Sequence, residues 1–102
     1  MNFTYDELLM ASNYKQTDPT YWCKDNKFCP VGIILNMRGI EWKTYSKGHR
    51  SPADGYVHES IMTLITFAHF IGYRSANDFL EALHDTETVR AKILQKAETL
   101  LK

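Results

Sequence analysis

Two cysteines and two histidines are the residues of this chain whose types could do chemistry together. Cys23 and Cys29 are followed by His49 and His58, and a Cys2His2 set can close a tetrahedral zinc site. Structural zinc sites favour two to four residues between paired ligands, whereas five separate the cysteines and eight separate the histidines. The spacing disfavours zinc. We expect both thiols to lie in the core, because free cysteine behaves as a small apolar residue.

Nucleophilic catalysis would need one of these thiols, a base within hydrogen-bond reach and a third group that orients the base. None of the four histidines carries a local signature of that kind. A Gly-rich phosphate loop and a serine nucleophile elbow are also missing from the sequence. We therefore expect a protein that is not an enzyme and needs no cofactor. A zinc-binding or enzymatic protein ranks third among the hypotheses.

Charge is sorted along the chain, although twelve basic and twelve acidic residues make it neutral overall. Residues 24–50 hold six of the basic residues against two acids, so this stretch is locally +4 and each flank is −2. Trp42 and Tyr45 lie among these cations. Aromatic residues among cations are typical of single-stranded nucleic acid binding and of protein interfaces. The predicted partner-binding surface consists of Arg38, Lys43, Tyr45, Lys47, His49 and Arg50.

A purely structural role for the same stretch is the alternative. In that interpretation Trp22 and Trp42 hold the loops against the helices, and the lysines keep the loop soluble. Our functional hypothesis is a small binding protein that recognises another protein, as an inhibitor or adaptor of the kind encoded by phages and toxin-immunity loci. That assignment is based on small size and missing catalytic motifs.

Length and composition predict a single domain over residues 1–102. The chain is 44% hydrophobic and 24% charged, which is ordinary for a globular protein. The first residues lack a signal-peptide pattern, and no stretch reaches the apolar length of a membrane span. We therefore expect a cytoplasmic protein with reduced thiols and no membrane contact, folded alone or as a homodimer.

Local signals predict a mainly α domain of four to five helices. Thr4 and Glu7 have the spacing of a capping box, and Gly39 and Gly72 stand where helices would close. The apolar run after His58 indicates a buried central helix. The expected helices cover residues 5–13, 30–38, 58–71, 76–84 and 86–101.

The centre of the chain is expected to be irregular. Residues 19–27 are predicted to be a loop with some helix, because Pro19 could begin a short helix while the next charged residues suggest a turn. Residues 40–45 alternate between apolar and polar, which suggests a short strand without a partner. Residues 46–55 contain the common loop formers and no periodicity, so we expect an exposed, mobile connection.

A short part of the chain is similar to a family of DNA-binding proteins. Phe70 to Leu83, in which Gly72 and Ser75 lead into an acidic helix with spaced apolar residues, resembles the turn and second helix of small ribbon-helix-helix proteins. The resemblance covers about fourteen residues. It implies a small DNA-binding regulator, the alternative to protein recognition, and the central basic patch is the other route to nucleic acid. As a helix-turn-helix, the segment would present acidic charges that repel phosphate.

Overall fold

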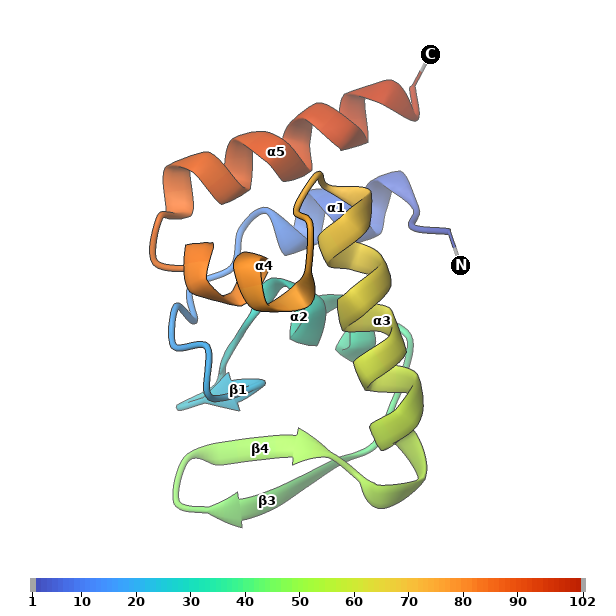
Figure 1. Ribbon diagram of the computed structural model, residues 1–102. Coiled ribbons are helices and arrows are strands. Elements are labelled where there is room, and N and C mark those ends of the chain that lie inside the picture. Colours follow the sequence, from blue (N-terminus) through green and yellow to red (C-terminus); the bar gives the residue numbers. More distant parts are fainter. Residues whose placement is uncertain (1, 102) are drawn as a thin grey trace.

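Five α-helices and two β-hairpins form the fold of the computed structural model, which describes residues 2–101 (Figure 1). The mainly helical prediction is right in outline, but the strands form a four-stranded antiparallel sheet, more than the single short strand expected. The elements in chain order are α1 (Tyr5–Ala11), β1 (Cys23–Lys24), β2 (Lys27–Phe28), α2 (Pro30–Met37), β3 (Trp42–Ser46), β4 (His49–Pro52), a 3-10 turn (Asp54–Tyr56), α3 (Val57–Phe70), α4 (Ala76–Ala82) and α5 (Thr86–Thr99).

Side-chain caps begin three of the helices as the sequence indicates. The capping box of α1 is present: the Thr4 hydroxyl accepts from the Glu7 amide at 3.1 Å, and the Glu7 carboxylate accepts from the Thr4 amide at 3.0 Å. The side chains of Ser75 and Asp85 cap α4 and α5 by accepting from the amides of Asp78 and Thr88. The five predicted helices are confirmed, although each ends one or two residues earlier than expected.

The helical core is closed at the end of the molecule where α1 lies between α2 and α5 (Figure 1). Tyr14, which follows α1, is fully buried and donates its hydroxyl to the Leu83 carbonyl at 2.6 Å. Arg90 of α5 donates to the carbonyls of Ser12 and Tyr14 at 2.6 and 3.0 Å. These bonds connect residues 69 to 78 positions apart and fix the end of α4 and α5 against the N-terminal segment.

The expectation that α3 is a buried central helix is only partly right. Its buried side chains lie on one face and include two polar residues, Ser60 and Thr63. Elsewhere on the helix, Val57, Ile61 and Met62 are between 40 and 45% exposed. An apolar run in the sequence cannot show which side of the helix faces solvent, because its hydrophobic residues occur on most sides of the helix.

Residues 2–101 contain no helix both long and apolar enough to cross a membrane.

The first hairpin corrects the prediction for residues 19–27, which form no helix. Strands β1 and β2 pair antiparallel, with Cys23 opposite Phe28, and two residues connect them. Both connecting residues, Asp25 and Asn26, have positive φ angles of 53° and 63°. Two residues with positive φ define the turn that matches the twist of a tight hairpin, and Asp and Asn tolerate this conformation better than most residues.

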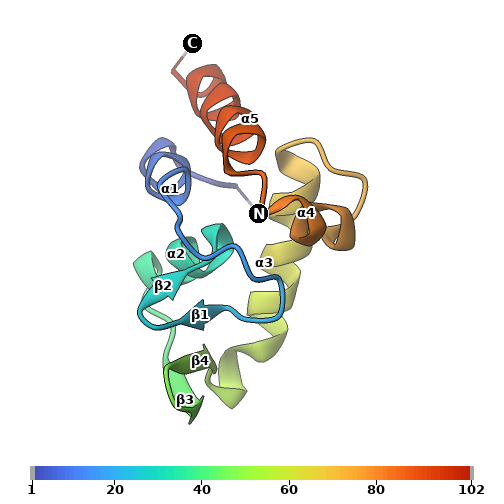
Figure 2. The ribbon, with the colours of Figure 1, turned by 90° about the vertical axis from the view of Figure 1, so that its left-hand side faces the viewer.

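The second hairpin corrects the prediction for residues 46–55, because four of them form β4 and two belong to the 3-10 turn. Strand β4 is the partner that the predicted strand lacked, and β4 also pairs with β1, so the sheet order is β2-β1-β4-β3 (Figure 2). The register shifts between Thr44 and Ser46, which leaves Tyr45 in a bulge. Figures 1 and 2 show both hairpins at the end of the molecule away from α5.

Candidate functional site

The two hairpin turns are held side by side in one rigid arrangement. The Asp25 amide donates to the Gly48 carbonyl at 2.7 Å, which ties the first turn to the second. Gly48 has a φ of +77°, and a Cβ atom there would collide with the Asp25 carboxylate. Beneath the sheet, the ring centroids of Phe28 and Trp42 lie 5.2 Å apart. The hairpins thus present fixed positions for the side chains on their outer surface.

The rings of Tyr21 and Tyr45 lie against His49 on this part of the molecule. The His49 ring lies 4.0 Å from the Tyr21 ring, nearly parallel to it, and 5.8 Å from the Tyr45 ring. The Ser46 hydroxyl is 2.7 Å from Nδ1 of His49, and the Lys24 ammonium lies 5.5 Å from the centre of the Tyr21 ring. Tyr45 is 51% exposed. The cluster offers ring faces and a cation to a partner.

A polar hollow of about 440 Å³ opens between the two turns. Lys47 and Arg50 bring positive charge to it, and Asp25 brings one carboxylate. The salt bridges found among residues 2–101 involve Arg38, Lys43 and Arg74, so neither cation of the hollow takes part in one. We call the hairpin surface the set formed by the ring cluster, Tyr21, Lys24, Tyr45 and His49, together with the two cations of the hollow, Lys47 and Arg50. Arg50 follows His49 in β4, so these two side chains leave opposite faces of the sheet.

Four of the six residues predicted for a partner-binding surface come together here, and two do not. Tyr45, Lys47, His49 and Arg50 belong to the hairpin surface. Lys43 bonds to the Asp54 carboxylate at 2.6 Å, and this bond lowers the pKa of Asp54.

Arg38 lies elsewhere in the structure. Its guanidinium makes two bonds of 2.6 and 2.9 Å to the Glu7 carboxylate and a third to the Asn2 carbonyl. Burial raises the pKa of Glu7, but the bonds from Arg38 and from the Thr4 amide outweigh it and hold the pKa below its ordinary value. Arg38 therefore has a structural role at the helical end of the protein.

Sequence reasoning missed Tyr21 and Lys24 as members of the site. Lys24 lies opposite His49 in the pairing of β1 with β4, and this pairing brings Tyr21 onto the His49 ring. The available signal was the pair Asp25-Asn26, whose tolerance of positive φ indicates a tight hairpin turn. A turn at that position would have predicted that the residues before it belong to a strand.

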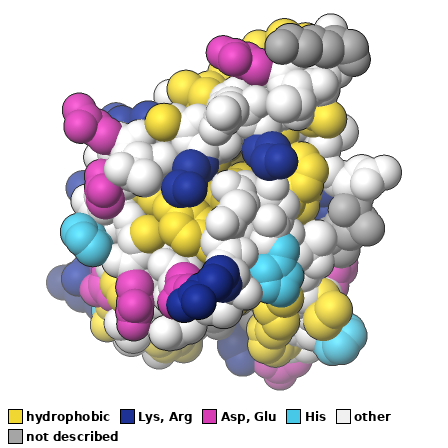
Figure 3. All heavy atoms as spheres, turned by 45° about the horizontal axis from the view of Figure 1, so that its top comes forward, with side chains coloured by type: hydrophobic (Ala, Val, Ile, Leu, Met, Phe, Trp, Pro, Cys, Tyr) yellow, Lys and Arg dark blue, Asp and Glu magenta, His cyan; other side chains and the backbone are white. Residues whose placement is uncertain are grey.

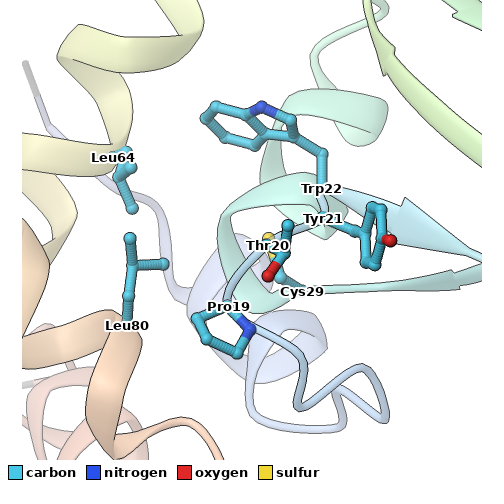
Figure 4. Close-up of a pocket in the computed structure, with 7 residues that line it drawn as sticks. All are labelled: Pro19, Thr20, Tyr21, Trp22, Cys29, Leu64 and Leu80. Carbon is cyan, nitrogen blue, oxygen red and sulfur yellow. The ribbon is translucent and has the colours of Figure 1, made fainter. Parts of the chain in front are cut away.

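A small apolar cavity of about 130 Å³ adjoins the hairpin surface (Figure 4). Residues 19–22 form one side of it, Cys29 lies at its base, and Leu64 of α3 and Leu80 of α4 form the other side. Figure 4 shows both leucines facing Pro19 and Trp22 across the open space, while the Tyr21 ring points away from it toward the strands. Tyr21 therefore belongs to both the cavity and the hairpin surface.

The two cysteines at this end of the molecule have structural positions. Both cysteines are free and buried, as predicted for core residues. Cys29 caps α2 by accepting from the Gly32 amide at 3.2 Å, and burial raises the pKa of its thiol to about 11, so it is protonated at neutral pH. The Ser46–His49 bond spans a hairpin turn between neighbours. Across residues 2–101, no three His, Cys, Asp or Glu side chains converge to hold a metal ion.

The opposite end of the molecule shows cations used differently. Figure 3 looks onto the surface of α5 and its neighbours, where hydrophobic side chains reach the surface among cations and acids. Lys92 lies 5.1 Å from the centre of the Tyr73 ring, and Lys96 lies 5.7 Å from the centre of the Phe70 ring. These lysines cover aromatic rings of the helices that pack below them, which is a structural use of charge.

Comparison with family models, with curated proteins and with solved structures finds no match to this chain. The resemblance of residues 70–83 to ribbon-helix-helix proteins therefore depends only on the local sequence motif. The strand that precedes α3 is β4, which is paired on both sides within its own sheet. Asp78 and Glu81 of α4 bring acidic charge to that segment, which makes the hairpin surface the better candidate for an interaction site.

Proposed function

We propose that this protein is a non-enzymatic binding protein that recognises another protein through the hairpin surface, as an inhibitor or adaptor acting in the cytoplasm. The observation that carries the proposal is that the two joined hairpins bring together a ring cluster, formed by Tyr21, Tyr45 and His49 with Lys24, and a hollow lined by Lys47 and Arg50. Tyrosine and arginine are enriched at the energetic centres of protein interfaces. A preformed sheet also lowers the entropy cost of binding.

Two features favour a protein partner over nucleic acid. The carboxylates of Asp18 and Asp25 lie among the cations, where they would repel a phosphate backbone. The cavity beside Tyr21 has apolar walls and suits a hydrophobic side chain. Free buried thiols are also in keeping with the reducing cytoplasm that the sequence predicts.

The proposal is tested by affinity capture from a lysate of the source organism, treated with nuclease so that nucleic acid does not bridge proteins. The immobilised proteins are the wild type, the double variant Lys47→Glu with Arg50→Glu, and Arg74→Glu. Arg74 is a matched control, because its side chain is 93% exposed and lies outside the hairpin surface. We expect the double variant to recover about tenfold less of the partner than the wild type or the control does. Equal recovery by all three proteins would show that the hairpin surface is not the interface.

Nucleic acid is the second candidate, because the hairpin whose Lys47 and Arg50 line the hollow also carries the exposed ring of Tyr45. Cations next to exposed aromatic rings are the arrangement that single-stranded nucleic acid uses. Fluorescence anisotropy with single-stranded and duplex oligonucleotides separates the two candidates. Binding that weakens steeply with salt and is lost in the double variant would replace the protein partner with nucleic acid.

A further inference from the structure

We propose that the partner adds one extended segment of its chain to the outer edge of β3, as a further strand of the sheet. This inference rests on the proposed function and names the way in which the partner is held. Strand β3 is the last strand in the order β2-β1-β4-β3, and within residues 2–101 it pairs with β4 alone (Figure 1). Its residues after Trp42 are exposed.

One hydrogen bond beside the ladder shows which residues of β3 bond to β4. The Ala53 amide donates to the Glu41 carbonyl at 2.8 Å, and the register places these two residues opposite each other. Bonded and non-bonded pairs alternate along an antiparallel ladder, so Trp42 occupies a non-bonded position and Lys43 a bonded one. Pro52 lies opposite Trp42 and has no N–H to donate, which agrees with a non-bonded pair.

The backbone groups of two residues of β3 therefore face the open edge. At a non-bonded position the N–H and the C=O point away from the paired strand. Trp42 and Thr44 occupy these positions, and no hydrogen bond described for residues 2–101 reaches their backbone groups. Each residue thus presents one donor and one acceptor. An extended chain meets such a row, because alternate residues of a strand direct their backbone groups to the same side.

Lys43 disfavours a second copy of this protein as the added strand. The symmetric antiparallel register that uses all of these groups pairs Trp42 of each copy with Thr44 of the other, which puts the two Lys43 side chains directly opposite. Like charges at such positions destabilise pairing, and edge strands use lysine against it. A strand of another protein can place an uncharged residue there, while the Lys43 ammonium keeps its bond of 2.6 Å to Asp54.

The open edge is continuous with the hairpin surface. Thr44 lines the hollow together with Lys47 and Arg50. The exposed ring of Tyr45 follows Thr44, and the register shift at this bulge ends the regular pairing. The added strand therefore bonds to β3 through its backbone, and its neighbouring side chains reach the hollow and the Tyr45 ring.

The backbone of the added segment is recognised more than its side chains. Residues that bond to β3 cannot be proline, because proline lacks the N–H. β-branched and aromatic residues are favoured, since they fit a pleated strand. We therefore expect a partner segment that is extended, free of proline and uncharged opposite Lys43.

Hydrogen exchange of the protein alone tests the assignment of the edge. The Lys43 amide bonds to β4 in this assignment, whereas the Thr44 amide faces solvent. Nuclear magnetic resonance should therefore show exchange about tenfold slower at Lys43 than at Thr44. Equal protection of the two amides would show that Thr44 has no free N–H, and it would overturn the inference.

Selection from a random peptide library, with the full-length protein as the target, supplies a defined probe. In the best peptide, methylation of single backbone nitrogens should weaken binding about tenfold at alternate positions and by less than about twofold between them, because only alternate N–H groups face β3. Methylation effects without this alternation overturn the inference, and so does a library that yields no binding peptide.

A proline variant tests the same bonds from the side of the protein. Thr44→Pro removes an outward donor but no bond between β3 and β4, because Thr44 occupies a non-bonded position. Thr44→Ala is its matched control, since it loses the same hydroxyl but keeps the N–H. The peptide should bind about tenfold more weakly to Thr44→Pro than to Thr44→Ala, and equal binding overturns the inference. Circular dichroism checks the folding of both variants, and the methylated peptides test the wild type in any case.

Partner capture separates this inference from the proposed function. Capture that is lost in Lys47→Glu with Arg50→Glu but kept in Thr44→Pro would overturn the added strand and leave the hairpin surface as the interface. Capture that is lost in both variants supports the added strand. Self-association in analytical ultracentrifugation that Thr44→Pro abolishes would assign the edge to a second copy and overturn the inference.

Discussion

Arg38 and Arg50 come from the same basic stretch of the sequence but have opposite roles in the structure. Arg38 bonds to Glu7 and Asn2 at the helical end and lies over the Phe3 ring at 5.3 Å. Arg50 lies on the sheet beside an open hollow, and no salt bridge within residues 2–101 includes it. The comparison shows that a count of charges along the chain does not identify a binding surface, because the fold uses some of those charges and leaves others exposed.

The largest expected effect separates these two arginines directly. Arg38→Ala removes one member of a half-buried ion pair and leaves the Glu7 carboxylate without it, and it also removes packing over Phe3. We expect the free energy of unfolding to fall by about 3 kcal/mol in urea denaturation at pH 7.

Arg50→Ala is the matched control, because it deletes the same side chain from an exposed position. Its free energy of unfolding should stay within about 0.5 kcal/mol of the wild type. Equal losses in the two variants would contradict the division into a helical end that uses its charges for structure and a hairpin end that leaves them for a partner.

The second prediction concerns the bond that attaches the end of α4 to the N-terminal segment. Tyr14→Phe removes the hydroxyl that donates to the Leu83 carbonyl and leaves this acceptor buried without its partner. We expect a loss of about 1.5 kcal/mol, measured by thermal or urea unfolding. Tyr45→Phe, at an exposed position of the hairpin surface, should change stability by less than about 0.5 kcal/mol. A loss in Tyr45→Phe that matches the one in Tyr14→Phe would mean that the hairpin end is as tightly bonded as the core.

The third prediction is a pH dependence of the helical end. The pKa of Glu7 is lower in the folded protein than its ordinary value near 4.5, so the carboxylate stabilises the fold above that value, and the contribution is lost as the pH falls through the folded pKa. Glu7→Gln keeps an acceptor for the Thr4 amide but removes the charge. It should cost about 1 kcal/mol at pH 7. The difference from the wild type should vanish at pH values below the folded pKa of Glu7, and a difference that persists there would contradict the ion pair as its source.

The helices could be predicted from the sequence because their signals are local. Thr4 and Glu7 form the capping box that their spacing indicates, and Ser75 and Asp85 cap the helices that follow them. The hairpins could not be predicted in this way. Strands of two residues, such as β1 and β2, are too short to show alternation, and only the left-handed turn between them distinguishes the segment from a loop.

Proline at position 52 also made β4 difficult to recognise. The Ala53 amide donates to the Glu41 carbonyl, so the backbone of Pro52 faces the other side of β4, where the pairing with β1 has already ended at Arg50. A missing N–H costs nothing at that position.

The candidate site was predictable where its residues are neighbours in sequence. Tyr45, Lys47, His49 and Arg50 are close together in the structure because one hairpin contains them all. Arg38 does not belong to the hairpin surface because it bonds to Glu7, thirty-one residues earlier in the sequence. Lys24 does belong to it because β1 pairs with β4. Such contacts follow from tertiary structure, which composition and spacing do not contain.

The smallest expected effect is the one that defines the hairpin surface as functional. Lys47→Glu with Arg50→Glu changes the charge of the hollow by four units, yet both side chains are exposed and make none of the salt bridges described for residues 2–101. The free energy of unfolding should therefore change by less than about 0.5 kcal/mol, and the new carboxylates should be screened further by salt. Circular dichroism during urea unfolding measures this, in parallel with partner capture. Loss of binding at unchanged stability would separate recognition from folding, whereas a loss of stability near that of Arg38→Ala would show that the fold depends on these charges.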